Sequence, residues 1–381
     1  MSAPTTEHLP LPAVAPGNSR HLTVLRFGRP GARPKAYVQA SLHADEIPGM
    51  LVAHHLRAGL EAAAAAGRLR GEVVLVPFAN PIGLTQHVLA EHLGRYALES
   101  ASNFNRHFPD LAPTAAERLA GRLGDDPVAN VATVRAALAE ALAATTADDE
   151  VQALRRTLLG LALDADIVLD LHCDLEAVLH LYLGTPLWPD AADLAADLGA
   201  EATLLARVSG GEPFDEAVGG PWWALADAFP DHPIPAACLA ATVELRGVAD
   251  VSDTLAATDA AGILRFLTRR GVLTGDPGPL PELRADATPL EGVEMLRAPV
   301  AGVLVHHRAP GEWVDAGDPV ATIVDPGAAR LGTSRTELLA GTSGRVYGRV
   351  AGRFVRPGTV VSKIAGATAL AGRAAGALLP D

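Results

Sequence analysis

The stretch KAYVQASLHADEIPG, residues 35–49, joins an apolar strand pattern directly to the start of a helix. A helix is predicted from Pro48 to about residue 66, because proline is tolerated in the first helical turn, where its missing N–H is not needed. His43 and Glu46 lie three residues apart in the connection. Open α/β sheets bind ligands at the carboxyl ends of their strands, so we expect both side chains to face a site there.

Outward from this stretch, strand patterns alternate with helical ones. Such alternation is typical of a layered α/β architecture with a mixed, mostly parallel sheet flanked by helices. Two helices are expected within the Ala- and Leu-rich residues 128–163. The other segments predicted to be strands are 21–28, 71–80, 166–172, 178–184, 201–207 and 241–247, and the other predicted helices are 190–199 and 253–271.

The composition of the chain predicts its division into domains. Residues 1–20 are expected to form a flexible N-terminal arm, and residues 21–273 the α/β domain. Residues 274–292 are rich in Pro and Gly and are expected to be a linker. Short β patterns with Gly turns follow, which predict a small all-β domain over 293–381.

The predicted C-terminal domain contains an internal repeat that resembles the barrel-sandwich fold of lipoyl and biotinyl domains. The copies are Gly302, Val314, Gly317 and Ile323, followed by Gly344, Val355, Gly358 and Ile364. A carrier domain of that type needs a Lys between its halves, and the connector 324–341 has none. We therefore expect a structural domain that forms a rim of the active site or a contact between subunits.

Charge and composition limit the possible partners. The net charge of −13 argues against nucleic acid or an anionic membrane as the main partner, because both require clustered Lys and Arg. No apolar run reaches 18 residues, and the first 20 residues do not resemble a secretory signal, so a cytoplasmic location is expected. Two free thiols at Cys173 and Cys238 are favoured over a disulfide. The oligomeric state is left open, with a homo-oligomer as one option.

A third residue completes a candidate metal site. His172 ends the apolar strand pattern of 166–172, again at a carboxyl edge. Asp170 shares its strand face and is a candidate partner for its ring. Two imidazoles and a carboxylate suit one Zn²⁺, and a catalytic zinc site keeps a fourth position open for water. We therefore expect His43, Glu46 and His172 to hold one zinc ion per chain.

Taken together, five short motifs resemble the succinylglutamate desuccinylase/aspartoacylase family, a branch of the zinc carboxypeptidase superfamily. They are HADEIPG from His43, NPIG from Asn80, NFNRHFPD from Asn103, DLH from Asp170 and VELRG from Val243. Ala44 departs from the usual Gly of the first motif. The small C-terminal β domain also resembles the extra domain of this branch.

The resemblance implies a zinc carboxypeptidase-like fold and assigns roles to individual residues. His43, Glu46 and His172 match the zinc ligands, Glu244 the catalytic glutamate, and Asn105 with Arg106 the pair that grips a substrate carboxylate. Arg95 is a looser match to the arginine that polarises the scissile carbonyl. Other interpretations remain for these positions: an ion pair of Glu244 with Arg246, an ordinary loop pair at Asn105 and Arg106, and a surface position for Arg95.

The function expected from these residues is hydrolysis of an amide in an N-acylated amino acid or a similar small carboxylate. Zinc and Glu244 would activate the water. A metallocarboxypeptidase acting on short peptides and a non-catalytic metal-binding module are the alternatives. Residues 207–223 are expected to form a mobile loop beside the site, with Trp222 and Trp223 either shaping the pocket or packing as anchors. His107 and His180 are further candidates for the pocket wall.

Overall fold

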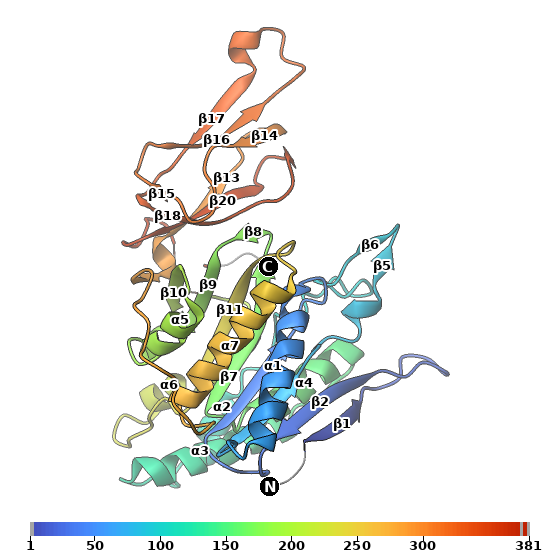
Figure 1. The fold of residues 1–381 in the computed structure, drawn as a ribbon, viewed down its shortest axis with the longest axis vertical. Helices are drawn as coiled ribbons and strands as arrows, with labels where there is room; N and C mark the ends of the chain where they lie inside the picture. The colour runs from blue at the N-terminus through green and yellow to red at the C-terminus, as the bar shows by residue number, and fades with distance from the viewer. Residues whose placement is uncertain (1–3, 374–375, 379–381) are drawn as a thin grey trace.

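The computed structural model describes residues 4–373 and 376–378. Residues 1–3 of the expected arm, and residues 374–375 and 379–381 of the expected C-terminal domain, lie outside the described residues. Figure 1 shows an α/β unit, drawn from blue to yellow, with a smaller β unit in orange and red above it. The predicted fold class, a mixed and mostly parallel sheet with flanking helices and C-terminal antiparallel sheets, is confirmed.

The centre of the α/β unit is a mixed sheet, which has nine strands within the described residues, in the order β1-β2-β4-β3-β7-β11-β9-β10-β12. The four adjacent strands β4, β3, β7 and β11 run parallel to one another. The bounds in chain order are β1 Thr5–Pro10, β2 His21–Phe27, β3 Lys35–Ala40, β4 Glu72–Val76, β7 Ile167–Asp174, β9 Leu179–Gly184, β10 Ala202–Ala206, β11 Leu239–Gly247 and β12 Ala287–Pro289.

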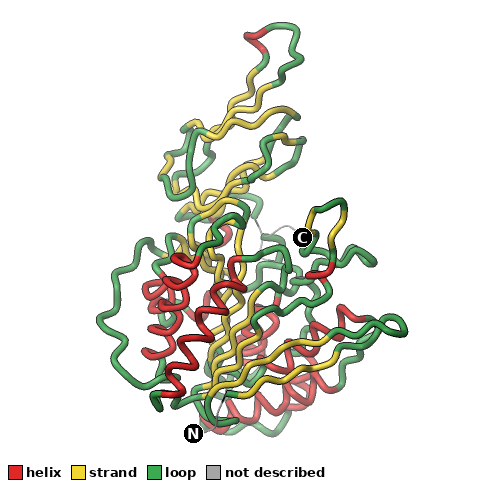
Figure 2. The backbone as a smooth tube through the Cα atoms, turned by 45° about the vertical axis from the view of Figure 1, so that its right-hand side comes forward, coloured by secondary structure: helices red, strands yellow, loops and turns green. Residues whose placement is uncertain are grey.

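Helices cover both faces of this sheet, as the red segments on either side of the yellow strands in Figure 2 show. One face packs against α1 (Pro48–Ala65), α5 (Ala192–Leu198) and α7 (Asp253–Arg269). The other face packs against α2 (Ala112–Leu119), α3 (Pro127–Ala143), α4 (Glu150–Ala162) and α6 (Phe214–Ala228). Burial of both faces explains why the central strands read as continuous apolar runs rather than alternating ones.

Short elements complete the α/β unit. A small hairpin pairs β5 with β6. The remaining elements are β5 His87–Val88, β6 Glu91–His92, β8 Glu176–Ala177, and the 3-10 turns η1 Gly83–Thr85, η2 Thr185–Leu187 and η3 Leu290–Gly292. None of the helices in the described part of the chain has the length and apolar character needed to cross a bilayer. Cys173 and Cys238 are both free and buried.

Two expectations for the ends of the α/β unit differ from the structure. The expected flexible arm contains β1, which pairs antiparallel with β2 as an edge strand. Its sequence, TTEHLP, carries little apolar signal because an edge strand buries few side chains, and it is held by backbone bonds and by the Arg26–Glu7 ion pair. The expected linker ends in β12, which pairs parallel with β10.

The expected mobile loop over residues 207–223 is wrong for its second half, because Phe214–Ala228 is the helix α6. Pro221 lies inside this helix, and such a residue argues against helix in a sequence reading. Trp222 is fully buried and Trp223 nearly so, each in the core on a different face of the sheet. Both tryptophans therefore act as packing anchors, and neither lines the pocket that contains His43, Glu46 and His172.

The C-terminal unit consists of two antiparallel sheets that face each other. One contains β13 Val293–Arg297, β15 Trp313–Val314, β18 Gly344–Arg349 and β20 Val360–Gly366. The other contains β14 Gly302–His306, β16 Pro319–Val324, β17 Arg335–Leu339 and β19 Phe354–Val355, and the turn η4 spans Leu331–Thr333.

The internal repeat corresponds to equivalent positions in the two halves of this unit. Gly302 pairs with Val355, and Gly344 pairs with Val314. The glycine of each half is therefore the strand partner of the valine of the other half. Both valines are buried. The two turn glycines, Gly317 and Gly358, have φ of +94° and +87°, a conformation that side chains other than Gly rarely adopt.

The C-terminal unit is attached to the segment that follows His172. β8 pairs antiparallel with β18, which joins a strand of the α/β unit to the C-terminal sheet. Glu176 in β8 forms ion pairs with Arg349 and Arg353, both at 2.6 Å. Lys363 in β20 forms an ion pair with Asp174 at the end of β7. The smaller unit is therefore fixed to the strand that carries the candidate metal ligand.

Candidate metal centre and pocket

The turn after β3 places His43 and Glu46 on one side of the chain. Ser41 has φ +56°, which turns the backbone sharply after the strand. Its hydroxyl donates to the Glu46 carbonyl at 3.0 Å, and the Glu46 N–H donates to the His43 carbonyl at 3.1 Å. This compact turn brings two side chains three residues apart to the carboxyl edge of the sheet before α1 begins.

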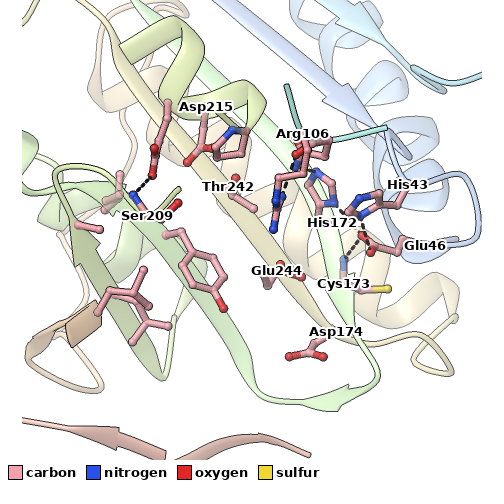
Figure 3. A pocket seen from close by; sticks show the side chains of 18 of the residues that line it. His43, Glu46, Arg106, His172, Cys173, Asp174, Ser209, Asp215, Thr242 and Glu244 are labelled. Atoms are coloured by element: carbon pink, nitrogen blue, oxygen red, sulfur yellow. Dashed lines mark hydrogen bonds and ion pairs between the residues drawn. The ribbon is translucent and has the colours of Figure 1, made fainter. Parts of the chain in front are cut away.

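The three predicted ligands converge. One ligand atom from each of His43, Glu46 and His172 lies within 4.8 Å of the others, and all three residues are buried. His43 Nδ1 is 2.9 Å from Glu46 Oε1, and His172 Nδ1 is 2.7 Å from Glu46 Oε2. Figure 3 shows the two imidazoles and the carboxylate turned toward one another. This metal-ligand cluster gathers residues from two non-adjacent segments of the chain.

The outer nitrogens of both rings are held by acceptors. His43 Nε2 lies 2.8 Å from Asn103 Oδ1, and His172 Nε2 lies 2.9 Å from Asp170 Oδ2. Carbonyl and carboxylate oxygens accept hydrogen bonds, so each Nε2 donates to its acceptor and each Nδ1 faces the cluster. Two imidazole nitrogens and one carboxylate arranged in this way fit Zn²⁺. Asn103 is the first residue of the motif NFNRHFPD, but the sequence analysis assigned it no role.

The electrostatics of the cluster favour ionised Glu46 and link metal binding to pH. Burial alone would raise the pKa of Glu46, but the neighbouring His43 and His172 outweigh it and hold that pKa well below the usual value. Burial lowers the pKa of His43. For His172, burial is outweighed by Asp170 and Glu46, which raise its pKa well above 6.5. A metal must therefore displace a proton from His172, so binding weakens in acid.

Glu244 lies beside the cluster on the neighbouring strand. In the parallel pairing of β11 with β7, Glu244 is directly opposite His172. Its Oε2 is buried and has no hydrogen-bond partner among the described residues. Burial and the nearby Glu46 raise the pKa of Glu244 to about 8. The alternative ion pair with Arg246 is wrong, because Arg246 has φ +66° and pairs with Asp259 instead.

Arg95 reaches the cluster although its side chain is partly exposed. Its Nη1 lies 3.0 Å from Glu46 Oε1 and 3.2 Å from His43 Nδ1. The preceding residue, Gly94, packs so closely on the turn that an added Cβ would lie 2.2 Å from the Asp45 nitrogen. Only glycine permits this approach, which brings Arg95 to the cluster rather than to a distant surface.

Asn105 and Arg106 line the same pocket. Arg106 is 6% exposed, and its Nη1 donates to the Asn105 carbonyl at 2.8 Å. The Asn105 side-chain oxygen accepts from the Phe214 N–H at 2.8 Å, which ties the motif to the start of α6. These contacts hold a buried guanidinium at the pocket wall, where its planar fork of donors suits a carboxylate.

Several pocket residues were missed by sequence reasoning. Asp174 had a signal, because it lies two residues after His172 and therefore on the same strand face. Lys363 is one of two lysines in the chain. The other missed residues that line the pocket include Tyr182, Leu183, Leu204, Ala206, Ser209, Asp215, Glu216, Thr242, Leu290 and Met295.

The two further histidine candidates do not line this pocket. His107 is largely exposed and lies 3.7 Å from Glu212. His180 is buried and is directly opposite Glu244 in the pairing of β11 with β9, with Nδ1 bonded to the Val178 carbonyl. Its ring packs edge-on against Tyr182 and Tyr347.

Comparison with known protein families and structures is consistent with this geometry. Residues 32–270 match the model of the succinylglutamate desuccinylase/aspartoacylase catalytic domain. The chain belongs to that family. Members of the succinylglutamate desuccinylase/aspartoacylase family are deacylases, a class of hydrolases, and the predicted resemblance is confirmed.

Solved structures from the same family share the whole fold. A protein of this family from Shewanella amazonensis has 28% identity and a TM-score of 0.84 over 95% of this chain and 98% of its own. One from Shewanella frigidimarina has 25% identity and a TM-score of 0.82 over 96% and 98%. A third, from Rhodobacter sphaeroides, has 17% identity and a TM-score of 0.65 over 95% of each chain, which shows the fold alone. Comparison with curated proteins gives no match.

Proposed function

We propose that this protein is a zinc-dependent deacylase that hydrolyses the amide bond of a small N-acylated amino acid. The observation that carries the proposal is the position of Glu244, whose unpartnered carboxylate oxygen lies in the same pocket as the His43, Glu46 and His172 cluster. Zinc held by these three residues would supply Lewis acidity, which lowers the pKa of water and polarises a carbonyl.

The chain's own residues account for proton movement and substrate positioning. Glu244 accepts a proton from the attacking water at its free oxygen and returns it to the leaving nitrogen as the amide bond breaks. Arg95 donates toward the carbonyl oxygen as negative charge develops on it. Arg106 and Asn105 hold the substrate carboxylate, which sets the distance of the scissile bond from Glu244.

The C-terminal unit favours a small substrate over a peptide. Met295 and Lys363 of that unit, and Leu290 just before it in the chain, line the pocket. A long peptide would have to pass these residues to reach the cluster, whereas a single acylated amino acid would not extend so far. A non-catalytic metal module has no need for a buried, unpartnered carboxylate beside its metal, because such a group is costly to bury.

A substrate screen with metal analysis tests the proposal. Purified protein should contain about one zinc per chain, and should hydrolyse N-acetyl and N-succinyl amino acids faster than di- and tripeptides. A chelator should abolish the activity and added zinc should restore it. Faster cleavage of peptides would favour the carboxypeptidase alternative, and zinc binding without any hydrolysis would favour the metal-binding module.

A further inference from the structure

Residues 208–212 form a loop in the pocket wall whose backbone conformation its own sequence does not set. In this wall loop, Gly210, Gly211 and Glu212 have φ of +113°, +74° and +46°. Glu212 has a side chain, and such residues rarely adopt a positive φ unless neighbouring segments hold them there. Ser209 of the wall loop lines the pocket (Figure 3). The contacts that hold the wall loop therefore shape the pocket.

On one side, the wall loop packs against Arg106 and the two residues that follow it. A Cβ added to Gly211 would lie 2.6 Å from Arg106 Cδ, so the loop backbone touches the stem of this side chain. The His107 N–H donates to the Gly211 carbonyl at 2.7 Å, and the Phe108 N–H donates to the Glu212 carbonyl at 3.1 Å. The wall loop therefore fixes the side chain that the proposed mechanism assigns to the substrate carboxylate.

On the other side, the wall loop is bonded to residues 376–378, here called the tail. The Gly376 N–H donates to the Val208 carbonyl at 3.0 Å, and the Leu378 N–H donates to the Ser209 carbonyl at 2.8 Å. Two backbone hydrogen bonds thus join the tail to the same loop that packs on the arginine. A displaced tail would leave both loop carbonyls without these donors and would free the loop to change conformation.

The tail is anchored by one apolar side chain and one arginine. Leu378 is 2% exposed and belongs to a buried apolar cluster that contains Leu204 of β10 and Val293 of β13. Arg373 Nη2 donates to the Leu378 carbonyl at 2.7 Å and to the Leu290 carbonyl at 3.3 Å. Burial of a leucine side chain is favourable by about 1.5–3 kcal/mol, so Leu378 is the main anchor of the tail.

We propose that Leu378 is a positioning residue for substrate binding: it holds the tail against the wall loop, and the wall loop holds Arg106 toward the substrate carboxylate. This inference rests on the proposed deacylase function and deepens it. Leu378 itself does not line the pocket, so it acts through the wall loop. Its contribution is therefore confined to substrates that carry the carboxylate which Arg106 binds.

Two substrates that differ only in the carboxylate test the inference, namely N-acetyl-leucine and N-acetyl-leucinamide, with acetate release as the assay. In the zinc-loaded enzyme, Leu378→Ala should raise KM for the carboxylate substrate by about tenfold and leave kcat/KM for the carboxamide within about threefold of wild type. The zinc content should not change. Equal losses on both substrates would indicate a general disturbance and would overturn the inference, as would a wild-type enzyme that does not distinguish the two substrates.

Further variants separate the anchor from general effects of mutation. Leu378→Met keeps an apolar side chain of similar volume and should retain the wild-type KM. Leu331→Ala makes the same kind of truncation at a side chain of the C-terminal unit that is 91% exposed, and it should behave as wild type. Arg373→Gln removes the donor to the Leu378 carbonyl without opening the apolar cluster. It should raise KM in the same direction, and it serves as the second variant if Leu378→Ala does not fold.

Hydrogen exchange distinguishes failure of this inference from failure of the deacylase function. The amides of His107 and Phe108 are bonded to the wall loop, so Leu378→Ala should speed their exchange by about tenfold or more, whereas the amides of β7 should exchange as in wild type. Unchanged exchange at His107 and Phe108, or faster exchange with an unchanged KM, would overturn the inference. If exchange is faster but the wild-type protein hydrolyses no acyl amino acid, the deacylase function fails and the link from the tail to the pocket stands.

Discussion

Glu244 and His172 are direct neighbours across the β11–β7 pairing, so both side chains emerge on the same face of the sheet. The proposed general base and one proposed metal ligand are thus held by the backbone hydrogen bonds of a central, buried ladder. Sites built on such strands are more precise than sites built on loops. This relationship underlies the first three predictions.

Replacing the proposed base should separate catalysis from metal binding. Glu244→Gln keeps the shape of the side chain but removes the proton acceptor, so kcat should fall by about 10²–10⁴-fold while the zinc content is unchanged. Steady-state kinetics and elemental analysis of the same preparation measure both. Glu61→Gln, on the exposed face of α1, is a matched control that should behave as wild type. A Glu244→Gln enzyme with normal turnover would exclude this residue as the base.

Removing the partner of the third ligand should weaken the metal site. Asp170 is completely buried, and its Oδ2 orients the ring of His172. Asp170→Asn should reduce zinc affinity by about 10–100-fold, and zinc should restore activity at higher concentration. Competition with a chromophoric chelator gives the affinity. An unchanged affinity would show that the Asp170–His172 contact does not tune the site.

Activity should rise with pH along an acid limb. Glu244 must be ionised to accept a proton, and burial together with Glu46 raises its pKa from 4.5 to about 8. A bound divalent cation lowers the pKa of a nearby carboxyl, so the limb in kcat/KM should lie between these values. Below the limb Glu244 is protonated and inactive. A pH–rate profile that is flat from pH 4.5 to 8 would be inconsistent with this assignment.

The ion pair of Lys363 with Asp174, which links the C-terminal unit to the α/β unit, should contribute to the stability of the protein. Its ammonium is paired with Asp174, whose side chain is 11% exposed. Lys363→Met leaves that carboxylate without its partner and should lower the free energy of unfolding by about 1–3 kcal/mol. Lys363→Arg, which keeps the charge, should lose less. Urea denaturation measures both, and equal losses for Met and Arg would show that packing rather than charge matters there.

Backbone conformation alone should set the cost of a glycine replacement in the C-terminal repeat. Gly358 has φ +87°, and an added Cβ would meet nothing within 4 Å. Gly358→Ala should therefore destabilise the protein by about 1 kcal/mol through strain. Gly332 has equally open surroundings without a positive φ, so Gly332→Ala is the control and should change stability little. Thermal unfolding that ranks the two variants in the opposite order would contradict this reasoning.

Local sequence patterns alone were enough to predict the fold class, most of the helices and strands, and the candidate site residues. Periodicity identified the buried strands and most helices, because apolar runs and turn residues report on burial within one segment. Residue type and motif resemblance singled out His43, Glu46, His172 and Glu244, and the structure brings these four residues together in one pocket. Patterns failed where the segment gave no apolar signal, as in β1, or a contrary one, as with Pro221 in α6.

Only the tertiary structure decided which distant side chains share the pocket. Lys363 and Asp174 are 189 residues apart in the chain, yet the docking of the C-terminal unit places their side chains in contact. The positive charge that Lys363 brings to the pocket wall is therefore paired with a carboxylate. Net charge and composition carry no such information, because an ion pair and the loss of solvent are properties of position in space, not of residue type.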